Sequence, residues 1–155
     1  MKAQDAIVAA GQGTGSAKFG TASFEPEPLA EPACFEARYV GTVCLLDVSG
    51  EVDAFNSPDL DAAIAGVAQA HRGAVVVSFV DCSFADCSCL SVLIRQFKQL
   101  AARLLIVAPP ATALGRILRL AKLTSVLPVH GSLLQAYLAI APDPSASLLE
   151  LANRD

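Results

Sequence analysis

AVVVSFVDCSFADCSCLSVLIRQFKQLAAR, residues 74–103, is the stretch that decides the fold. Its first part, Ala74–Val80, is mostly apolar and β-branched, which is typical of a strand buried on both faces in a parallel sheet. Apolar residues then recur at the spacing of one helix face: Leu90, Leu93, Ile94, Phe97, Leu100 and Ala101. The stretch therefore predicts a buried strand followed by an amphipathic helix at the centre of the domain.

Four residues lie where this strand gives way to the helix: Asp86, Cys87, Ser88 and Cys89. Asp86 is the expected N-cap, because its carboxylate can accept hydrogen bonds from the free amides of the first helical turn. Small polar side chains at such a position face solvent near the positive end of the helix dipole. We therefore place the candidate functional site at these four residues.

The chain has 155 residues, enough for one domain with a substantial core, and its net charge is −4. A negative charge disfavours nucleic acid as a partner, because nucleic-acid binding usually needs a basic surface. The charge is unevenly distributed: residues 36–86 include eight acids and two bases, whereas residues 87–141 include six bases and no acid. One end of the folded domain should therefore be acidic and another basic, unless the charges simply scatter over the surface.

No secretory signal is recognisable at the start, and no apolar run reaches the roughly 18 residues that a membrane span needs. The five cysteines are odd in number, and we interpret them as reduced thiols of a cytoplasmic protein. Cys82, Cys87 and Cys89 offer three metal ligands, but a structural zinc site needs four and no histidine lies near them. We expect no metal, no other cofactor and no membrane association.

Composition divides the chain into three segments. Residues 1–33 are rich in glycine and proline, so we expect a flexible N-terminal arm. Gly11–Lys18 superficially resembles a phosphate-binding loop, but it lacks the Gly-Lys-Ser/Thr ending and no convincing strand precedes it. Residues 34–141 should form the folded domain, and residues 142–155 a polar C-terminal tail.

The folded segment alternates between strand and helix patterns. Short strands at residues 35–40 and 43–48 predict an opening hairpin. Ser57 and Pro58 fit the N-cap and the first position of a helix. The remaining expected elements are strands at residues 104–108 and 126–129, and helices that begin after Pro110 and after Gly131. The pattern predicts an α/β domain with a mostly parallel sheet of four to five strands and about four helices.

Several motifs in this order resemble the STAS domain, the fold of bacterial anti-sigma factor antagonists. The resemblance covers residues 34–141 and lies in four places: Gly50–Asp53, Val80–Asp86, Pro110 with Ile117–Leu120, and Val126–Val129 followed by Gly131–Leu133. The first is similar to the family's turn before its first helix, and the second to the family's approach to a phosphorylation switch. Each motif alone is weak, but together they identify the fold as that of a STAS domain.

The resemblance implies a regulator that acts by binding rather than by catalysis. Family members bind a kinase-type anti-sigma factor and so free a sigma factor. The kinase phosphorylates a serine or threonine at the start of the central helix, and the added charge and bulk abolish the complex. Here Cys87 stands at the phosphoacceptor position, Ser88 at the second hydroxyl position, and Cys89 where the family has glycine. Either Ser88 accepts phosphate, or the protein escapes kinase control, or another chemistry regulates it.

On this interpretation, the partner-binding surface comprises the Glu51–Asp53 turn, the Asp81–Cys89 segment and the exposed face of the central helix. The side chains expected to contact the partner are Asp53, Ser83, Asp86, Cys89, Ser91 and Arg95. The partner, the sigma factor and the oligomeric state do not follow from the sequence.

Thiol chemistry offers two other interpretations. Cys82, Cys87 and Cys89 could form a redox switch, because a disulfide between Cys82 and Cys87, or one with Cys44, would distort the recognition segment. Cys87 and Cys89 could instead be the dithiol of an enzyme, although the usual spacing is Cys-x-x-Cys and neither histidine lies in a catalytic motif.

A third alternative is a stand-alone ligand-binding or scaffold module. Asp53, Asp86 and Ser88 would then line a small polar pocket, and saturable binding of a nucleotide without a protein partner would identify it.

Overall fold

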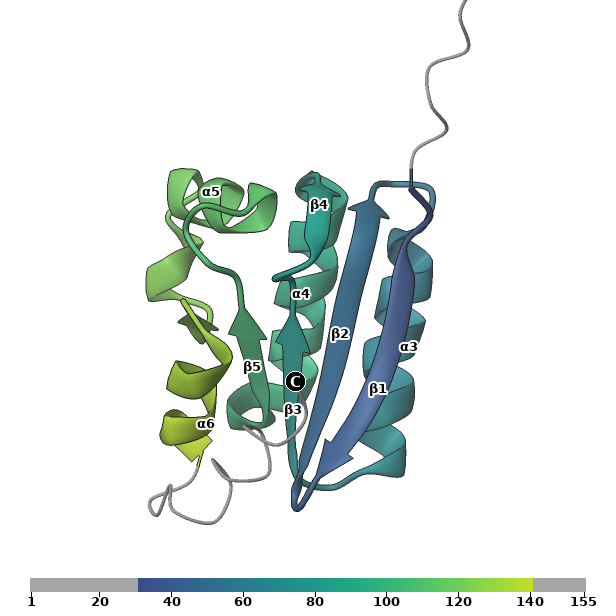
Figure 1. The fold of residues 1–155 in the computed structure, drawn as a ribbon, viewed down its shortest axis with the longest axis vertical. Helices are drawn as coiled ribbons and strands as arrows, with labels where there is room; N and C mark the ends of the chain where they lie inside the picture. Colours follow the sequence, from purple (N-terminus) through teal and green to yellow (C-terminus); the bar gives the residue numbers. More distant parts are fainter. Residues whose placement is uncertain (1–30, 141–155) are drawn as a thin grey trace, which may run out of the picture.

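The computed structural model describes residues 31–140, in which strands and helices alternate after an initial hairpin (Figure 1). The strands are β1 (Cys34–Val40), β2 (Val43–Val52), β3 (Ala74–Ser78), β4 (Cys82–Ala85), β5 (Leu104–Val107) and β6 (Val129–His130). The helices are α3 (Ser57–Ala70), α4 (Cys87–Leu100), α5 (Ala113–Leu120) and α6 (Leu133–Ile140), with 3-10 turns η1 (Ala101–Arg103) and η2 (Leu123–Ser125). Most of the predicted arm and the whole predicted tail lie outside the described residues.

The sheet is mixed, with the strand order β1-β2-β3-β5-β6. β1 and β2 are antiparallel, with Val40 opposite Val43, whereas β3, β5 and β6 add in parallel. This arrangement confirms the predicted α/β fold with an opening hairpin and a mostly parallel sheet. In the hairpin turn, Gly41 has a φ of +57°, a left-handed conformation that glycine adopts without steric cost.

β4 is a short strand that the sequence analysis did not predict. Cys82–Ala85, which lies between the central strand and α4, pairs in parallel with the carboxyl end of β2, beyond the part that pairs with β3. The chain leaves β3 through a turn in which the Cys82 N–H donates to the Phe79 carbonyl at 3.2 Å. The sheet therefore has six strands rather than four to five.

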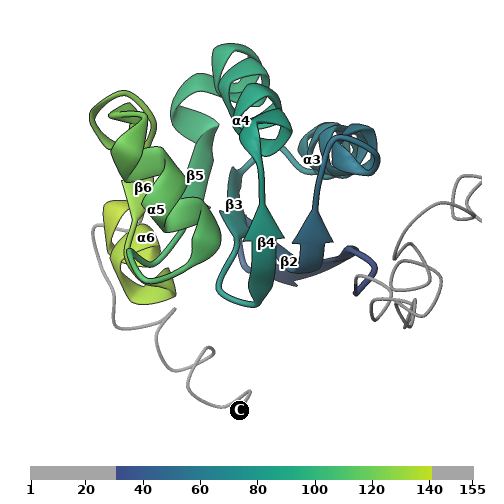
Figure 2. The same cartoon turned by 90° about the horizontal axis from the view of Figure 1, so that it is seen from above.

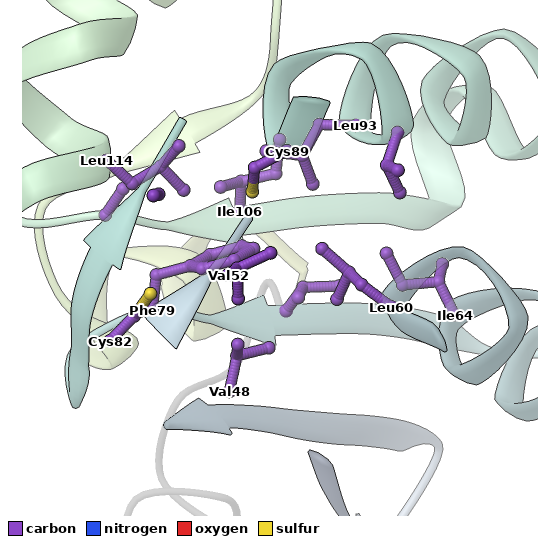
Figure 3. Packing of buried hydrophobic residues seen from close by; sticks show 14 of the residues in the cluster. Val48, Val52, Leu60, Ile64, Phe79, Cys82, Cys89, Leu93, Ile106 and Leu114 are labelled. Atoms are coloured by element: carbon purple, nitrogen blue, oxygen red, sulfur yellow. The ribbon is translucent and has the colours of Figure 1, made fainter. Parts of the chain in front are cut away.

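Helices cover both faces of the sheet. Successive side chains of a strand point to opposite faces and so belong to two different cores. Val75 and Val77 of β3 lie in the larger core with residues of α3, α4 and α5, whereas Val76 lies in the smaller core with Ala136 and Tyr137 of α6. Figure 2 shows α3 and α4 together on one side of the sheet. Figure 3 shows part of the larger core, with Val48, Val52, Leu60, Ile64, Phe79, Cys82, Cys89, Leu93, Ile106 and Leu114 labelled.

The predicted start of the first helix is wrong by one residue. Asn56, and not Ser57, is the N-cap of α3, while Ser57 is the buried first helical residue and is followed by Pro58. The shift arises because the Ser57 N–H donates to the Asp53 carbonyl at 2.9 Å, which continues the turn after β2 into the helix.

The predicted start of the last strand is also wrong. We expected a strand over residues 126–129, but β6 begins only at Val129. Val126 and Leu127 both donate their N–H groups to the Leu123 carbonyl, at 3.0 and 2.8 Å, and so continue the η2 turn.

The end of α3 is stabilised by a residue that is distant in sequence. The Arg103 guanidinium donates to the carbonyls of Ala68, His71 and Gly73 at 2.5 to 3.2 Å. Gly73 lies where a Cβ atom would be 1.8 Å from the Thr42 carbonyl oxygen, so no larger residue fits there. None of the helices between residues 31 and 140 has the length and apolar character that a membrane span needs.

Candidate functional site

Asp86 begins α4 as predicted. Its backbone is extended, with φ −116° and ψ −173°, and its carboxylate accepts the Ser88 N–H at 2.9 Å. The Ser88 hydroxyl donates to the same carboxylate oxygen. This hydroxyl is the main reason why the pKa of Asp86 lies below its usual value, and the amides of Ser88, Cys89 and Ala54 act in the same direction. Asp86 therefore holds the start of α4 as an ionised cap.

The three residues after Asp86 differ in exposure. Cys87 is exposed, Ser88 is half-buried and Cys89 is fully buried. Cys89 is therefore not available to a partner, which corrects its predicted role as a surface contact. The cause is the phase of the helix, since Cys89 shares one face with the buried residues Leu93 and Gln96.

The turn after β2 is tied together by side-chain hydrogen bonds. The Asp53 carboxylate accepts the N–H groups of Phe55 and Asn56 at 2.9 and 3.1 Å. The Asn56 side chain in turn accepts the Asp53 N–H and donates to the Glu51 carbonyl, at 2.9 and 2.8 Å. Just before this turn Gly50 has a φ of +78°, and the chain bulges between Gly50 and Glu51. The backbone of the turn is therefore held in one conformation.

This turn forms part of an acidic cavity of about 300 Å³. Four carboxylate residues line it: Glu31, Glu51, Asp53 and Asp59. Phe55 also lines it and is 94% exposed, which is unusual for so large an apolar side chain. Sequence reasoning missed Phe55, although an aromatic residue in a polar turn is a detectable signal.

β4 brings the Asp53 turn close to the start of α4. Phe84 of β4 is paired with Glu51 of β2, and its side chain is 46% exposed. Ser83, beside it, is also exposed. We group the exposed side chains of the turn after β2, of β4 and of the first turn of α4 under one name, the α4-start surface: Phe55, Ser83, Phe84 and Cys87, with the carboxylates of Glu51, Asp53 and Asp86.

The remaining predicted contacts lie further along α4. Ser91 is exposed, and its hydroxyl donates to the Cys87 carbonyl at 3.2 Å. Arg95 is exposed but forms an ion pair with Asp61 of α3 at 3.2 Å. Asp61 also accepts a hydrogen bond from the buried Gln96 side chain at 2.9 Å. Arg95 therefore joins the two helices in addition to facing solvent.

The sequence matches a model of the STAS domain over residues 35–136. The chain belongs to the STAS-domain family. Its structure is similar to that of an anti-sigma factor antagonist from Mycobacterium paratuberculosis, with 25% sequence identity and a TM-score of 0.61, over 70% of this chain and 94% of that one.

Two more distant structures share the STAS fold. A Thermotoga maritima protein is 16% identical, with a TM-score of 0.56 over 68% of this chain and 93% of that one. The unphosphorylated form of SpoIIAA, a Bacillus cell fate determinant and anti-sigma factor antagonist, is 17% identical, with a TM-score of 0.52 over 67% and 93%. None of the curated proteins matches the chain in sequence.

The ligand-binding alternative expected Asp53, Asp86 and Ser88 to line one small polar pocket. Asp53 lines the acidic cavity, but Asp86 and Ser88 do not. The cavity is lined by four carboxylates, which would repel the phosphates of a nucleotide. Within residues 31–140, no three His, Cys, Asp or Glu side chains are arranged to hold a metal ion.

The cysteines of this STAS domain differ in their exposure to solvent. All five cysteines are free, and Cys44, Cys82 and Cys89 are buried. Burial raises the pKa of all three thiols, that of Cys89 to about 12, which disfavours the reactive thiolate. Figure 3 shows the sulfur atoms of Cys82 and Cys89 inside the apolar core. Of the predicted redox set, only Cys87 is exposed in the folded protein.

Thiol titration should reflect this difference. We expect a bulky disulfide reagent such as Ellman's reagent to modify Cys34 and Cys87 in the native protein, and all five cysteines after unfolding in guanidinium chloride. The Cys87→Ala variant should lose one of the two fast-reacting thiols. Rapid modification of Cys82 or Cys89 in the native state, located by peptide mass mapping, would contradict the buried placement and revive the redox interpretation.

Proposed function

We propose that this STAS domain is an anti-sigma factor antagonist, which binds a kinase-type anti-sigma factor and so makes a sigma factor available for transcription. The similarity to the antagonist from M. paratuberculosis supports this function. The observation that carries it is the α4-start surface, where a capped helix start lies beside two exposed phenylalanines.

Exposed aromatic side chains beside charged groups favour a protein partner. Phe55 and Phe84 leave apolar area in water, and such residues often supply most of the binding energy when a partner covers them. The acidic cavity under Phe55 favours a partner that inserts a lysine or arginine side chain between the carboxylates. We therefore expect the partner's matching surface to be apolar at its centre and basic at its rim.

Binding accounts for the α4-start surface better than catalysis does. An exposed cysteine nucleophile needs a base within hydrogen-bond reach. The His71 ring instead lies 2.8 Å from the Thr42 carbonyl, at the opposite end of α3 from the Asp53 turn. His130 belongs to β6, beyond β5 in the sheet. A dithiol enzyme is disfavoured as well, because Cys89 is buried while Cys87 is exposed.

Cys87 suggests that this antagonist escapes phosphorylation. A thiol is not an ordinary substrate for a Ser/Thr kinase, and Cys87 occupies the position of the family's acceptor. Ser88 is a poor substitute, because it is half-buried and its hydroxyl already donates to Asp86. We propose that the protein binds its partner whether or not the partner has ATP.

The test is direct binding to kinase-type anti-sigma factors from the same genome, measured by calorimetry with the full chain. We expect the wild type to bind one of them, and Phe55→Ser to bind at least about tenfold more weakly, as an exposed aromatic anchor would. Leu138→Ser is the matched control, because Leu138 is also exposed but belongs to α6 on the other face of the sheet. It should bind like the wild type.

One result would overturn the proposed function, and another would overturn only the proposed contact surface. Failure of the wild type to bind any such anti-sigma factor would remove the function. Equal binding by Phe55→Ser, Leu138→Ser and the wild type would keep the function but place the contact away from the α4-start surface.

A further inference from the structure

A second cavity, of about 180 Å³, lies at the carboxyl ends of β5 and β6. Figure 1 shows α5 above the end of β5, and the chain returns through η2 to β6. The carboxyl ends of parallel strands are where α/β sheets commonly bind ligands. No residue of the α4-start surface lines this cavity, so it is a separate feature of the fold.

Three polar side chains from three different elements line this second cavity. Arg119 comes from α5, Thr124 from η2 and His130 from β6. Within residues 31–140, none of these side chains forms a hydrogen bond or an ion pair with another group. In addition, no acidic residue occurs between residues 87 and 140. Arg119 and Thr124 are exposed and His130 is half-buried, so the hydrogen bonds of all three side chains go to solvent and are available to a ligand that displaces it.

The rest of the cavity is apolar. Ala108, Pro110 and Val129 line it, together with two glycines, Gly115 and Gly131. A mostly apolar cavity with a few converging polar groups is typical of a small-molecule site. Its volume is below the roughly 300–1,000 Å³ of sites for drug-sized ligands, so any occupant must be small.

The polar groups favour a negatively charged occupant. The planar guanidinium of Arg119 matches the two oxygens of a carboxylate or phosphate, and the Thr124 hydroxyl can donate a further hydrogen bond. Burial lowers the pKa of His130, so at neutral pH its ring offers one N–H donor without a second positive charge. The surrounding segment has only basic charged residues, which adds to the attraction for an anion.

We propose that this cavity binds a small organic anion, whose carboxylate or phosphate group contacts Arg119, Thr124 and His130 and whose short apolar part lies against Ala108, Pro110 and Val129. The proposal does not depend on the antagonist function, because the two sites share no residue.

The experiment is a titration of the ¹⁵N-labelled full chain, followed by amide chemical shifts in NMR spectra. The probes are sodium butyrate, inorganic phosphate and n-butanol, which has an apolar part but no charge. We expect saturable shifts confined to residues around the cavity, such as Gly115, Thr124 and Gly131, with at least one of the two anions. Saturation by butyrate alone would assign a carboxylate ligand, and saturation by phosphate alone would assign a phosphate ligand; both support the proposal.

Variants test the role of the guanidinium. Arg119→Gln should bind the anion at least about tenfold more weakly, because it loses a charge-assisted hydrogen bond. Arg116→Gln is the matched control: Arg116 is exposed on the same helix but does not line the cavity, so its variant should bind normally. Thr124→Val preserves side-chain shape while removing the hydroxyl, and should also weaken binding, which provides a second variant if Arg119→Gln is poorly folded.

Three results would overturn the proposal. The first is shifts that rise linearly with both anions and never saturate. The second is n-butanol binding at the same residues as tightly as the anions, because charge would then play no part. The third is unchanged anion affinity in both folded Arg119→Gln and Thr124→Val.

Discussion

Cys87→Ser should turn the protein into a substrate of its kinase-type partner, and phosphorylation should then weaken the complex at least about tenfold. The serine would present an exposed hydroxyl at the first position of α4, where the thiol now faces solvent. A phosphate there adds about −1.5 to −2 charges beside the Asp86 carboxylate and close to the acidic cavity. Intact mass would record the modification, and size-exclusion chromatography with and without ATP would record the complex.

The matched controls for this prediction are Cys34→Ser and Cys87→Ala. Cys34 is the other exposed cysteine but lies on β1, so its serine variant should stay unmodified. Cys87→Ala should bind the partner equally with and without ATP. Unmodified Cys87→Ser after incubation with an active kinase partner and ATP would reject the assignment of residue 87. Phosphate on Ser88 of the wild type would instead show that kinase control is retained.

Phe79→Ala should lower the free energy of unfolding by about 3–5 kcal/mol. Phe79 is fully buried where the chain leaves β3 for β4, and it belongs to the larger core (Figure 3). Its N–H donates to the Val107 carbonyl at 2.8 Å, which holds the backbone at Phe79 beside the end of β5. Urea denaturation followed by circular dichroism would measure the loss, provided that the slope with denaturant is unchanged.

Phe84→Ala is the control for this second prediction. This substitution removes the same kind of side chain at a site that is 46% exposed. The free energy of unfolding should therefore fall by less than about 1 kcal/mol. Similar losses for the two variants would contradict the placement of Phe79 in the core and of Phe84 on the surface.

The central strand and helix were predictable because their patterns are local. The apolar run of β3 and the helical spacing of α4 need no information from the rest of the chain, and Asp86 as the cap follows from the same stretch. β4 was not predictable in this way. Buried and exposed residues do not alternate along β4, since Cys82 and Ala85 are buried and the two residues between them are exposed. What makes it a strand is pairing with β2, about thirty residues earlier in the chain.

The candidate site was predicted only in part, because only some of its features follow from local sequence patterns. Cys87 and Ser88 were placed at the start of α4 by the local pattern, but the burial of Cys89 depends on what packs against that helix. Stricter use of the helix phase would have assigned Cys89 to the same face as Leu93. The exposure of Phe55 depends on how the Asp53 turn is folded and on the absence of a neighbour over it, which no local pattern contains.

The contacts of Arg103 affect the order in which the domain can be completed during synthesis. The carbonyls at the end of α3 lie 30 to 35 residues before the arginine that binds them. At a translation rate of about 5–20 residues per second, these carbonyls leave the ribosome roughly 1.5–7 s before Arg103 does. A nascent chain of that length also lacks β5, the neighbour of β3. The first half of the domain therefore cannot reach its final structure while it is being made, and folding has to follow the emergence of β5.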